Sequence, residues 1–192
     1  MLHLASRSPR RAELLRLIGV DFVLIDVEVD ERQHADEAPA AYVRRVAEEK
    51  ARAGAAGLPA QAVVLAADTT VSLDGAILGK PLDDDDARRM LARLSGRTHE
   101  VLTAVVVGTR ASLAVEVVTT RVEFMPLDDA VIAAYVASGE PADKAGAYGI
   151  QGLGGALVKR IEGSYGAVVG LPLAETAEML ARAGIGTALR SA

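Results

Sequence analysis

The sequence predicts an α/β fold built on a mixed β-sheet. Apolar runs of strand length alternate with segments of helical period, and an Asp74-Gly75 turn marks a hairpin between two neighbouring strands. Because hairpins join antiparallel strands and helices join parallel ones, the sheet should contain both kinds of pairing. At 192 residues, of which 51% are hydrophobic, the chain can bury a full core in one domain, residues 1–192, with room for two lobes.

The first elements are a strand, a helix and a second strand. Residues 1–5 are mostly apolar, and Ser8 and Pro9 then open a helix, since serine suits the N-cap and proline has no N–H to lose at the first helical position. Gly19 suits the end of this helix. Residues 21–25 form the next strand, and a polar loop follows it.

The middle of the chain contains a helix and a buried strand. Pro39 opens the helix, and its apolar face, which we expect Lys50 to end, carries Tyr42, Val43, Val46 and Ala47. Residues 62–67 are continuously apolar, as in a strand covered on both faces, and this strand should end at Asp68. The remaining elements are, in order, a hairpin strand in 76–81, a helix from Asp83 to Gly96, strands 98–107 and 113–124, a helix 128–137, a glycine-rich segment 146–155, one more strand, and a helix 171–183 ending at Gly184.

Composition excludes several classes of protein. The net charge is -5, and the chain has only two Phe, four Tyr and no Trp. Both observations argue against nucleic-acid binding, which needs a basic surface or stacking aromatics. No segment is long and apolar enough for a membrane helix or a signal peptide, so we expect a cytoplasmic protein that binds no membrane. Without cysteine there is no disulfide framework and no thiolate metal site.

Positive charge gathers at the start of the first helix. Arg7, Arg10 and Arg11, with Ser6 and Ser8, stand where the helix N-terminus already carries partial positive charge. An anionic ligand would compensate this excess. A solvated basic turn is the alternative, and the residues alone do not separate the two.

Asp68 is the first candidate for chemistry. A carboxylate that follows a buried strand should lie at the sheet edge where α/β proteins bind ligands, although a turn-forming aspartate is the alternative. Glu31 is the nearest second acid. Two carboxylates with phosphate oxygens suit Mg²⁺ or Mn²⁺, whereas the three histidines lack paired ligand spacing and do not indicate zinc.

Three other segments are candidate sites. Lys80 follows Gly79 on a turn from which an ammonium could reach a phosphate, but the spacing is not that of a Walker A motif and a surface lysine is the alternative. The four aspartates 83–86 suit the first turn of a helix better than a metal site. Residues 143–152 mix charges, an aromatic, an amide and glycines, which is typical of a ligand-binding loop.

Seven blocks of the chain together resemble the Maf family, the septum-formation-inhibitor proteins regarded as nucleoside triphosphate pyrophosphatases. The resemblance covers nearly the whole chain in the right order. The blocks are Leu4–Arg11 with Glu13–Leu15, Val46–Ala51, Ala67–Thr69, Gly79–Pro81, Leu94–His99 with Val101 and Thr103, Asp143–Gly152, and Gly163–Tyr165 with Val168–Leu173.

The resemblance implies a single Maf/Ham1-like (ITPase-like) domain, with an elongated mixed sheet flanked by helices and two lobes with a cleft between them. It also implies hydrolysis of a nucleoside triphosphate between its α and β phosphates, with Asp68 as proton acceptor and with Asp68 and Glu31 holding Mg²⁺ or Mn²⁺. We expect nearby cations to keep Asp68 ionised near neutral pH. The implied phosphate-binding residues are Ser6, Arg10, Arg11, Lys50, Lys80 and Lys144.

The resemblance extends to substrate choice. Arg10, Thr69 and Gln151 match the members that act on dTTP and UTP, whereas the 7-methyl-GTP type tends to carry Trp, Gln and Glu at these positions. Gln151 offers both a donor and an acceptor to a pyrimidine edge. Arg7 stands where relatives often have a small residue, and its role is open. A homodimer is also a family expectation.

Two other functions remain open on the sequence alone. The same pocket could serve a non-hydrolytic nucleotide-binding regulator of cell division, which would need the cations but not the base. An enzyme that transfers nucleotidyl or phosphoryl groups to an acceptor is the second alternative, and it would give acceptor-dependent products.

Overall fold

The computed structural model describes residues 1–190, and it confirms an α/β protein with a mixed sheet. Within that range no helix has the length and apolar character needed to cross a membrane. The helices and strands are β1 (Leu2–Ala5), α1 (Pro9–Leu17), β2 (Phe22–Ile25), α2 (Pro39–Ala56), β3 (Val63–Leu73), β4 (Ala76–Leu78), α3 (Asp84–Leu94), β5 (Thr98–Thr109), β6 (Ser112–Phe124), α4 (Asp129–Ala137), β7 (Val158–Glu162), α5 (Tyr165–Val169) and α6 (Leu173–Arg182).

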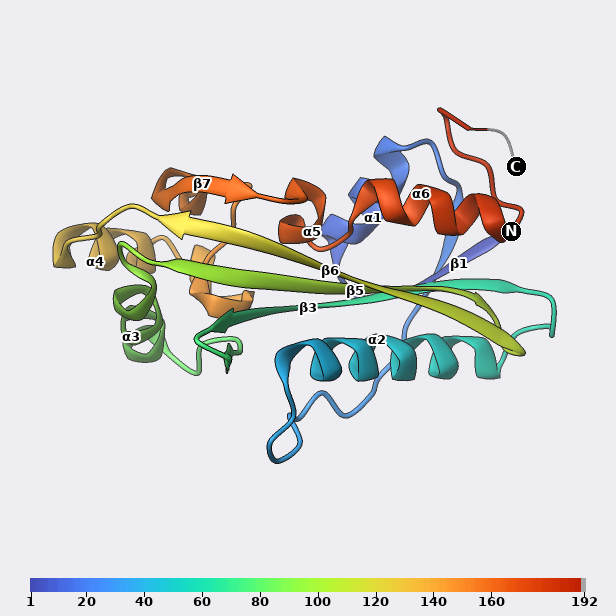
Figure 1. Cartoon of the computed structure of the whole chain (residues 1–192), viewed down its shortest axis with the longest axis horizontal. Helices are drawn as coiled ribbons and strands as arrows, with labels where there is room; N and C mark the ends of the chain where they lie inside the picture. Colours follow the sequence, from blue (N-terminus) through green and yellow to red (C-terminus); the bar gives the residue numbers. More distant parts are fainter. Residues whose placement is uncertain (191–192) are drawn as a thin grey trace. The chain divides into compact units, whose positions relative to one another are not determined.

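The sheet has seven strands in the order β2-β1-β3-β5-β6-β7, with β4 paired to β3. β1 pairs in parallel with both β2 and β3, and β4 pairs antiparallel with β3. β7 is antiparallel to β6 (Figure 1). The hairpin between β3 and β4 turns at Asp74 and Gly75, which have φ of 53° and 81°. Positive φ at both positions is what a type I′ turn requires, so the sequence prediction of this hairpin is confirmed.

The chain divides into two compact units. The first unit comprises residues 1–68, 103–118 and the segment from Gly170 onward, and the second comprises residues 69–102 and 119–169. Three strands, β3, β5 and β6, contribute residues to both units.

In the first unit, helices cover both faces of the strands. α2 lies on one face and α1 and α6 lie on the other (Figure 1). Gly54 allows α2 to approach β1 closely, because a Cβ at this position would lie 2.8 Å from the Cβ of Ala5. Ala51 and Ala55 are buried as well, so the apolar face of α2 continues past Lys50 instead of ending there as we expected. The buried face of α2 is therefore longer than the apolar residues before Lys50 predict.

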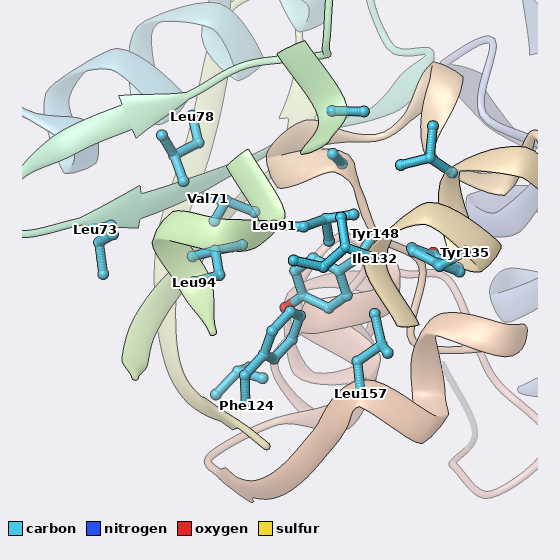
Figure 2. Packing of buried hydrophobic residues seen from close by; sticks show 14 of the residues in the cluster. Val71, Leu73, Leu78, Leu91, Leu94, Phe124, Ile132, Tyr135, Tyr148 and Leu157 are labelled. Atoms are coloured by element: carbon cyan, nitrogen blue, oxygen red, sulfur yellow. The ribbon is translucent and has the colours of Figure 1, made fainter. Parts of the chain in front are cut away.

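In the second unit, a hydrophobic cluster packs between the strands, α3, α4 and the glycine-rich segment (Figure 2). Phe124 and Tyr148 lie edge to face with ring centroids 4.7 Å apart, and the buried His99 ring lies 5.0 Å from Phe124 and 5.4 Å from Tyr148. Tyr148 belongs to the predicted ligand loop, so aromatic packing attaches that loop to β5 and β6. The glycine-rich segment overlaps two short 3₁₀ turns, Ala145–Ala147 and Leu153–Leu157, and a third, Glu140–Asp143, precedes it.

Two predicted boundaries are wrong. β3 does not end at Asp68 but continues to Leu73, because residues 71–73 pair with β4. Asp68 nevertheless lies beyond the end of β1, whose last residue, Ala5, pairs with Ala66. The predicted helix 171–183 begins only at Leu173, since Gly170 has φ of 132° and separates it from α5.

Candidate active site

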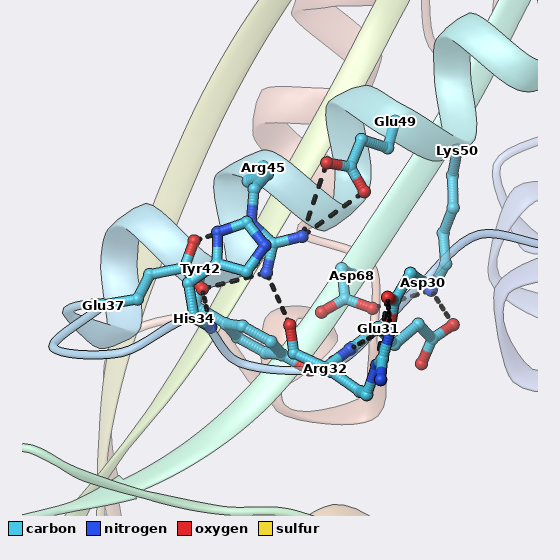
Figure 3. Close-up of polar contacts among 10 residues, drawn as sticks. All are labelled: Asp30, Glu31, Arg32, His34, Glu37, Tyr42, Arg45, Glu49, Lys50 and Asp68. Carbon is cyan, nitrogen blue, oxygen red and sulfur yellow. Dashed lines mark hydrogen bonds and ion pairs between the residues drawn. The ribbon is translucent and has the colours of Figure 1, made fainter.

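Asp68, Lys50 and Glu31 meet in the first unit. Lys50 projects from α2, Asp68 from β3 and Glu31 from the loop before α2 (Figure 3). The Nζ atom of Lys50 lies 2.8 Å from Oδ1 of Asp68 and 2.8 Å from Oε1 of Glu31. Asp68 is only 6% exposed, whereas Glu31 is open to solvent. One buried ammonium therefore holds two carboxylates that are far apart in the sequence.

Burial determines the proton affinity of Asp68. Desolvation raises the pKa of this carboxyl group above its ordinary value, although the charges of Lys50 and Arg11 oppose the rise. The cations therefore offset only part of the effect of burial, and our expectation that they keep Asp68 ionised near neutral pH stays a prediction. A carboxylate with a raised pKa accepts a proton more readily than a solvent-exposed aspartate, which is the property that a general base needs.

The loop that carries Glu31 is held by α2. The Tyr42 hydroxyl donates to the carbonyl of Glu31 at 2.9 Å, and burial together with the Asp68 and Glu31 charges raises the pKa of Tyr42 to about 12. Arg45 donates from Nε and Nη2 to the two carboxylate oxygens of Glu37, at 2.7 and 2.9 Å (Figure 3). Neither Tyr42 nor Arg45 was predicted as a site residue. Tyr42 and Arg45 precede Lys50 by eight and five residues, not by the three or four that bring side chains together on a helix, so helical spacing gives no signal for them.

Arg11 and Ser6 form a second polar pair in the first unit. Arg11, 8% exposed, donates from Nε to the carbonyl of Gly170 at 2.9 Å and from Nη1 to Oγ of Ser6 at 3.2 Å. Burial lowers the pKa of Arg11, and the Asp68 charge works against that change. Ser8 is the N-cap of α1, but its side chain makes no capping bond, and its N–H donates instead to Oγ of Ser6. Arg10, the next residue along α1, is half-buried.

The structure gives Arg7 a role that the sequence left open. Arg7 forms an exposed ion pair with Asp26, the residue that follows β2. Because β1 and β2 are parallel neighbours, the segments after their carboxyl ends lie side by side. Arg7 thus differs from Arg11, whose guanidinium is buried.

The other predicted site residues belong to the second unit. Lys80 is exposed, and the carbonyl of the preceding Gly79 accepts from the N–H of Gly146 at 3.0 Å. Lys144 donates from Nζ to Asp143 and to the carbonyl of Glu140, both at 2.7 Å. Gln151 is exposed on the same glycine-rich segment. The segments of these three residues are therefore joined within this unit.

Two further predicted features have clear structural outcomes. Thr69 follows Asp68 directly on β3, so the two side chains point to opposite faces of the strand. The aspartates 83–86 begin α3 as expected: Asp83 caps the helix by accepting from the N–H of Asp86 at 2.7 Å, and Asp85 and Asp86 pair with arginines one turn later. Within residues 1–190, no cluster of three or more acidic or histidine side chains is arranged for metal binding.

Comparisons with known proteins give a consistent result. The model of the Maf-like protein family matches residues 1–183. A dTTP/UTP pyrophosphatase of Methylobacillus flagellatus is 57% identical over 185 residues, covering 96% of this chain and 93% of that protein. Another of Anaeromyxobacter sp. is 58% identical, covering 95% and 89%, and one of Escherichia coli is 54% identical, covering 93% and 91%.

Among solved structures, the Ham1 protein of Staphylococcus aureus resembles this chain with a TM-score of 0.48 and 18% identity, over 64% of this chain and 71% of that one. The family match spans both compact units, and the relatives align over almost their full lengths. This chain belongs to the Maf family.

Proposed function

We propose that this chain hydrolyses dTTP and UTP to the nucleoside monophosphate and pyrophosphate. The observation that carries the proposal is the buried Asp68 carboxylate, raised in pKa and held 2.8 Å from Lys50. A carboxylate of this kind is suited to activating water rather than to forming a surface contact. The choice of substrate follows the relatives of 54 to 58% identity, which are named dTTP/UTP pyrophosphatase.

In the proposed reaction, Asp68 accepts a proton from the water that attacks the α-phosphorus. The bond from this phosphorus to the oxygen bridging to the β-phosphate breaks, and pyrophosphate leaves with its negative charge. Lys50, Arg10 and Arg11 supply positive charge for the phosphates, and Ser6 adds a hydroxyl. Lys80 and Lys144 are proposed to bind phosphate as well.

We also propose that Asp68 and Glu31 together hold a divalent cation, Mg²⁺ or Mn²⁺. The donor set fits, because both carboxylates converge on one positive charge, and phosphate oxygens and water would complete the ligands that Mg²⁺ prefers. When bound, such an ion polarises phosphoryl oxygens and offsets the charge that develops on them. Lys50 then keeps both carboxylates ionised and oriented.

Selection of the base is proposed to rest on Arg10, Thr69 and Gln151. Gln151 is exposed at the tip of a loop whose two ends are hydrogen-bonded, and its amide can both donate and accept. The single domain over residues 1–192, the homodimer and the cytoplasmic location stay predictions. The continuous family match over residues 1–183 supports the first of them.

Pyrophosphate release tests the proposed function. We expect release from dTTP and UTP in the presence of Mg²⁺ or Mn²⁺, and a fall of about a hundredfold or more in Asp68→Asn, which has no base to accept the proton. Asp85→Asn is the matched control, since Asp85 is exposed and pairs with Arg88 on the same helix.

Three results would contradict the proposal: no pyrophosphate from either nucleotide, equal release from Asp68→Asn, or products that depend on an added acceptor. Nucleotide binding without release would instead support a non-hydrolytic regulator. Acceptor-dependent products would indicate a transferase.

A further inference from the structure

The glycine-rich segment around Gln151 is held at both ends by two side chains outside it. The carboxylate of Glu140 accepts from the N–H of Leu153 at 2.8 Å and from that of Gly154 at 3.0 Å. The hydroxyl of Tyr135 accepts from the N–H of Gly149 at 3.0 Å and donates to Oε1 of Glu140 at 2.8 Å. These five residues, Tyr135, Glu140, Gly149, Leu153 and Gly154, are called the Glu140 network below.

Two glycines of the segment are required by this network. A Cβ at Gly152 would lie 2.2 Å from Oε2 of Glu140, and one at Gly154 would lie 2.5 Å from the Tyr135 hydroxyl. The backbone therefore approaches the two side chains more closely than any other residue type would permit. Gln151 lies between the hydrogen-bonded residues Gly149 and Leu153, so the network fixes both ends of the short stretch that presents it.

The Glu140 side chain suits this role because the charged form of its carboxyl group is favoured. Burial acts to raise its pKa, but the hydrogen bonds from Gly154, Tyr135 and Leu153 outweigh burial and hold the pKa below its ordinary value. An ionised carboxylate accepts hydrogen bonds at both of its oxygens, whereas the amide of a glutamine accepts at only one. The backbone carbonyl of Glu140 also accepts from Nζ of Lys144 at 2.7 Å, so the same residue positions a second proposed ligand of the substrate.

We propose that Glu140 is a positioning residue for base selection: its carboxylate, with the Tyr135 hydroxyl, holds residues 149–154 in the conformation that presents Gln151 to the base. This inference rests on the proposed function, because it assigns Gln151 to the nucleotide base. Glu140 touches no reacting atom in this scheme and acts only through the loop.

The test compares dTTP with dGTP in Glu140→Gln, Tyr135→Phe and a control, Glu123→Gln, whose carboxylate pairs with Lys159 on the neighbouring strand. An amide in place of the carboxylate points N–H donors at backbone N–H groups, so the loop loses its conformation. We expect the ratio of kcat/KM for dTTP to that for dGTP to fall about tenfold or more, through KM for dTTP. Tyr135→Phe should give a smaller fall, and Glu123→Gln none.

Inhibition by inorganic pyrophosphate distinguishes positioning from general damage, and it should be unchanged in Glu140→Gln. An equal loss on both nucleotides, with the ratio unchanged, would overturn the inference. If Glu140→Gln does not fold, Tyr135→Phe decides, and an unchanged ratio in that variant counts against the proposal.

If the proposed function is wrong, the unmodified protein hydrolyses neither nucleotide, which is a different result from those above. In that case equilibrium binding of dTTP and dGTP to the same variants replaces turnover. Loss of a dTTP preference on substitution supports the role of Glu140, and equal binding of both nucleotides by the unmodified protein overturns it.

Discussion

At the scale of single residues, the site depends on one buried cation shared by two carboxylates. Lys50 would be costly to bury alone, and Asp68 likewise, but each offsets the other at 2.8 Å. Removing Lys50 takes from Asp68 its direct ion-pair partner, in a position that is about nine-tenths buried. The charge state of Asp68 is therefore coupled to Lys50, and this coupling can be measured.

Lys50→Gln should move the acid limb of activity to higher pH. The Lys50 charge lowers the pKa of Asp68, whereas burial and the Glu31 charge raise it, so loss of the cation raises that pKa further. A base with a higher pKa becomes ionised only at higher pH, and we expect the acid limb of kcat/KM to move up by about one pH unit or more.

The shape of the profile is the informative quantity, because Lys50→Gln also removes a proposed phosphate ligand and lowers activity at every pH. Lys159→Gln, which removes an exposed lysine on β7, serves as control and should leave the limb in place. An acid limb that stays where it is, or moves down, in Lys50→Gln would show that Asp68 is not the titrating base.

At the scale of elements, α2 places two of the three residues that meet at the site, Lys50 and Glu31. It carries Lys50, and through Tyr42 and Arg45 it holds the loop that bears Glu31. Its position depends on the close approach to β1 at Gly54. A change in the packing of α2 against β1 would therefore also move Lys50 and the loop that bears Glu31.

Gly54→Ala should destabilise the protein although alanine favours helix. The added Cβ would lie 2.8 Å from the Cβ of Ala5, so α2 or β1 must shift. We expect a loss of about 1–3 kcal/mol in the free energy of unfolding, measured by urea denaturation, because overpacking outweighs the gain in helix propensity.

Gly57→Ala is the matched control at the end of the same helix. A Cβ at Gly57 meets no atom within 4 Å, and its φ of -92° is open to alanine. This variant should be neutral, or more stable by up to about 1 kcal/mol. Equal stability of Gly54→Ala and Gly57→Ala would contradict the packing argument.

At the scale of the whole molecule, one buried histidine makes the stability depend on pH. Burial lowers the pKa of His99 to about 4, and its Nε2 lies 2.8 Å from the Tyr148 hydroxyl. Nδ1 of the same ring is buried and has no hydrogen-bond partner within residues 1–190. The folded protein therefore holds this ring neutral, whereas in the unfolded chain it takes up a proton near pH 6.5.

We expect the free energy of unfolding to decrease as the pH falls, because the folded protein keeps His99 neutral. Below about pH 6.5 the unfolded chain binds the proton that the folded protein refuses until about pH 4, so stability declines over that window. Between pH 7 and pH 5 the loss from this group is about 2 kcal/mol, measurable by urea denaturation at both pH values.

His99→Phe should remove this part of the pH dependence, whatever its own stability at pH 7. His34→Gln, which changes an exposed histidine, should retain it. If the change in stability between pH 7 and pH 5 is the same in His99→Phe as in the unmodified protein, His99 is not the group responsible.

Local signals in the sequence determined most of the elements. The Asp74-Gly75 hairpin, the helix starts at Asp83 and Asp128, the proline at the start of α2 and the glycine after α1 all lie where predicted. Each of these signals acts over a few residues, through backbone conformation or a bond to a nearby N–H. Such preferences do not depend on the rest of the molecule and can be read from the sequence alone.

The sequence indicates Ser6, Arg11, Glu31 and Asp68 as site candidates from their own positions and Lys50 by resemblance, but it does not indicate their contacts. Lys50 meets Asp68 across 18 residues, and Arg11 meets the Gly170 carbonyl across 159. The continuation of β3 past Asp68, the dominance of burial over cations at that carboxyl group and the Glu140 network also depend on which segments pack together. The sequence by itself determined the elements and the types of residue in the site, and only the tertiary structure decided their partners and their proton affinities, because desolvation and long-range contacts exist only in the folded chain.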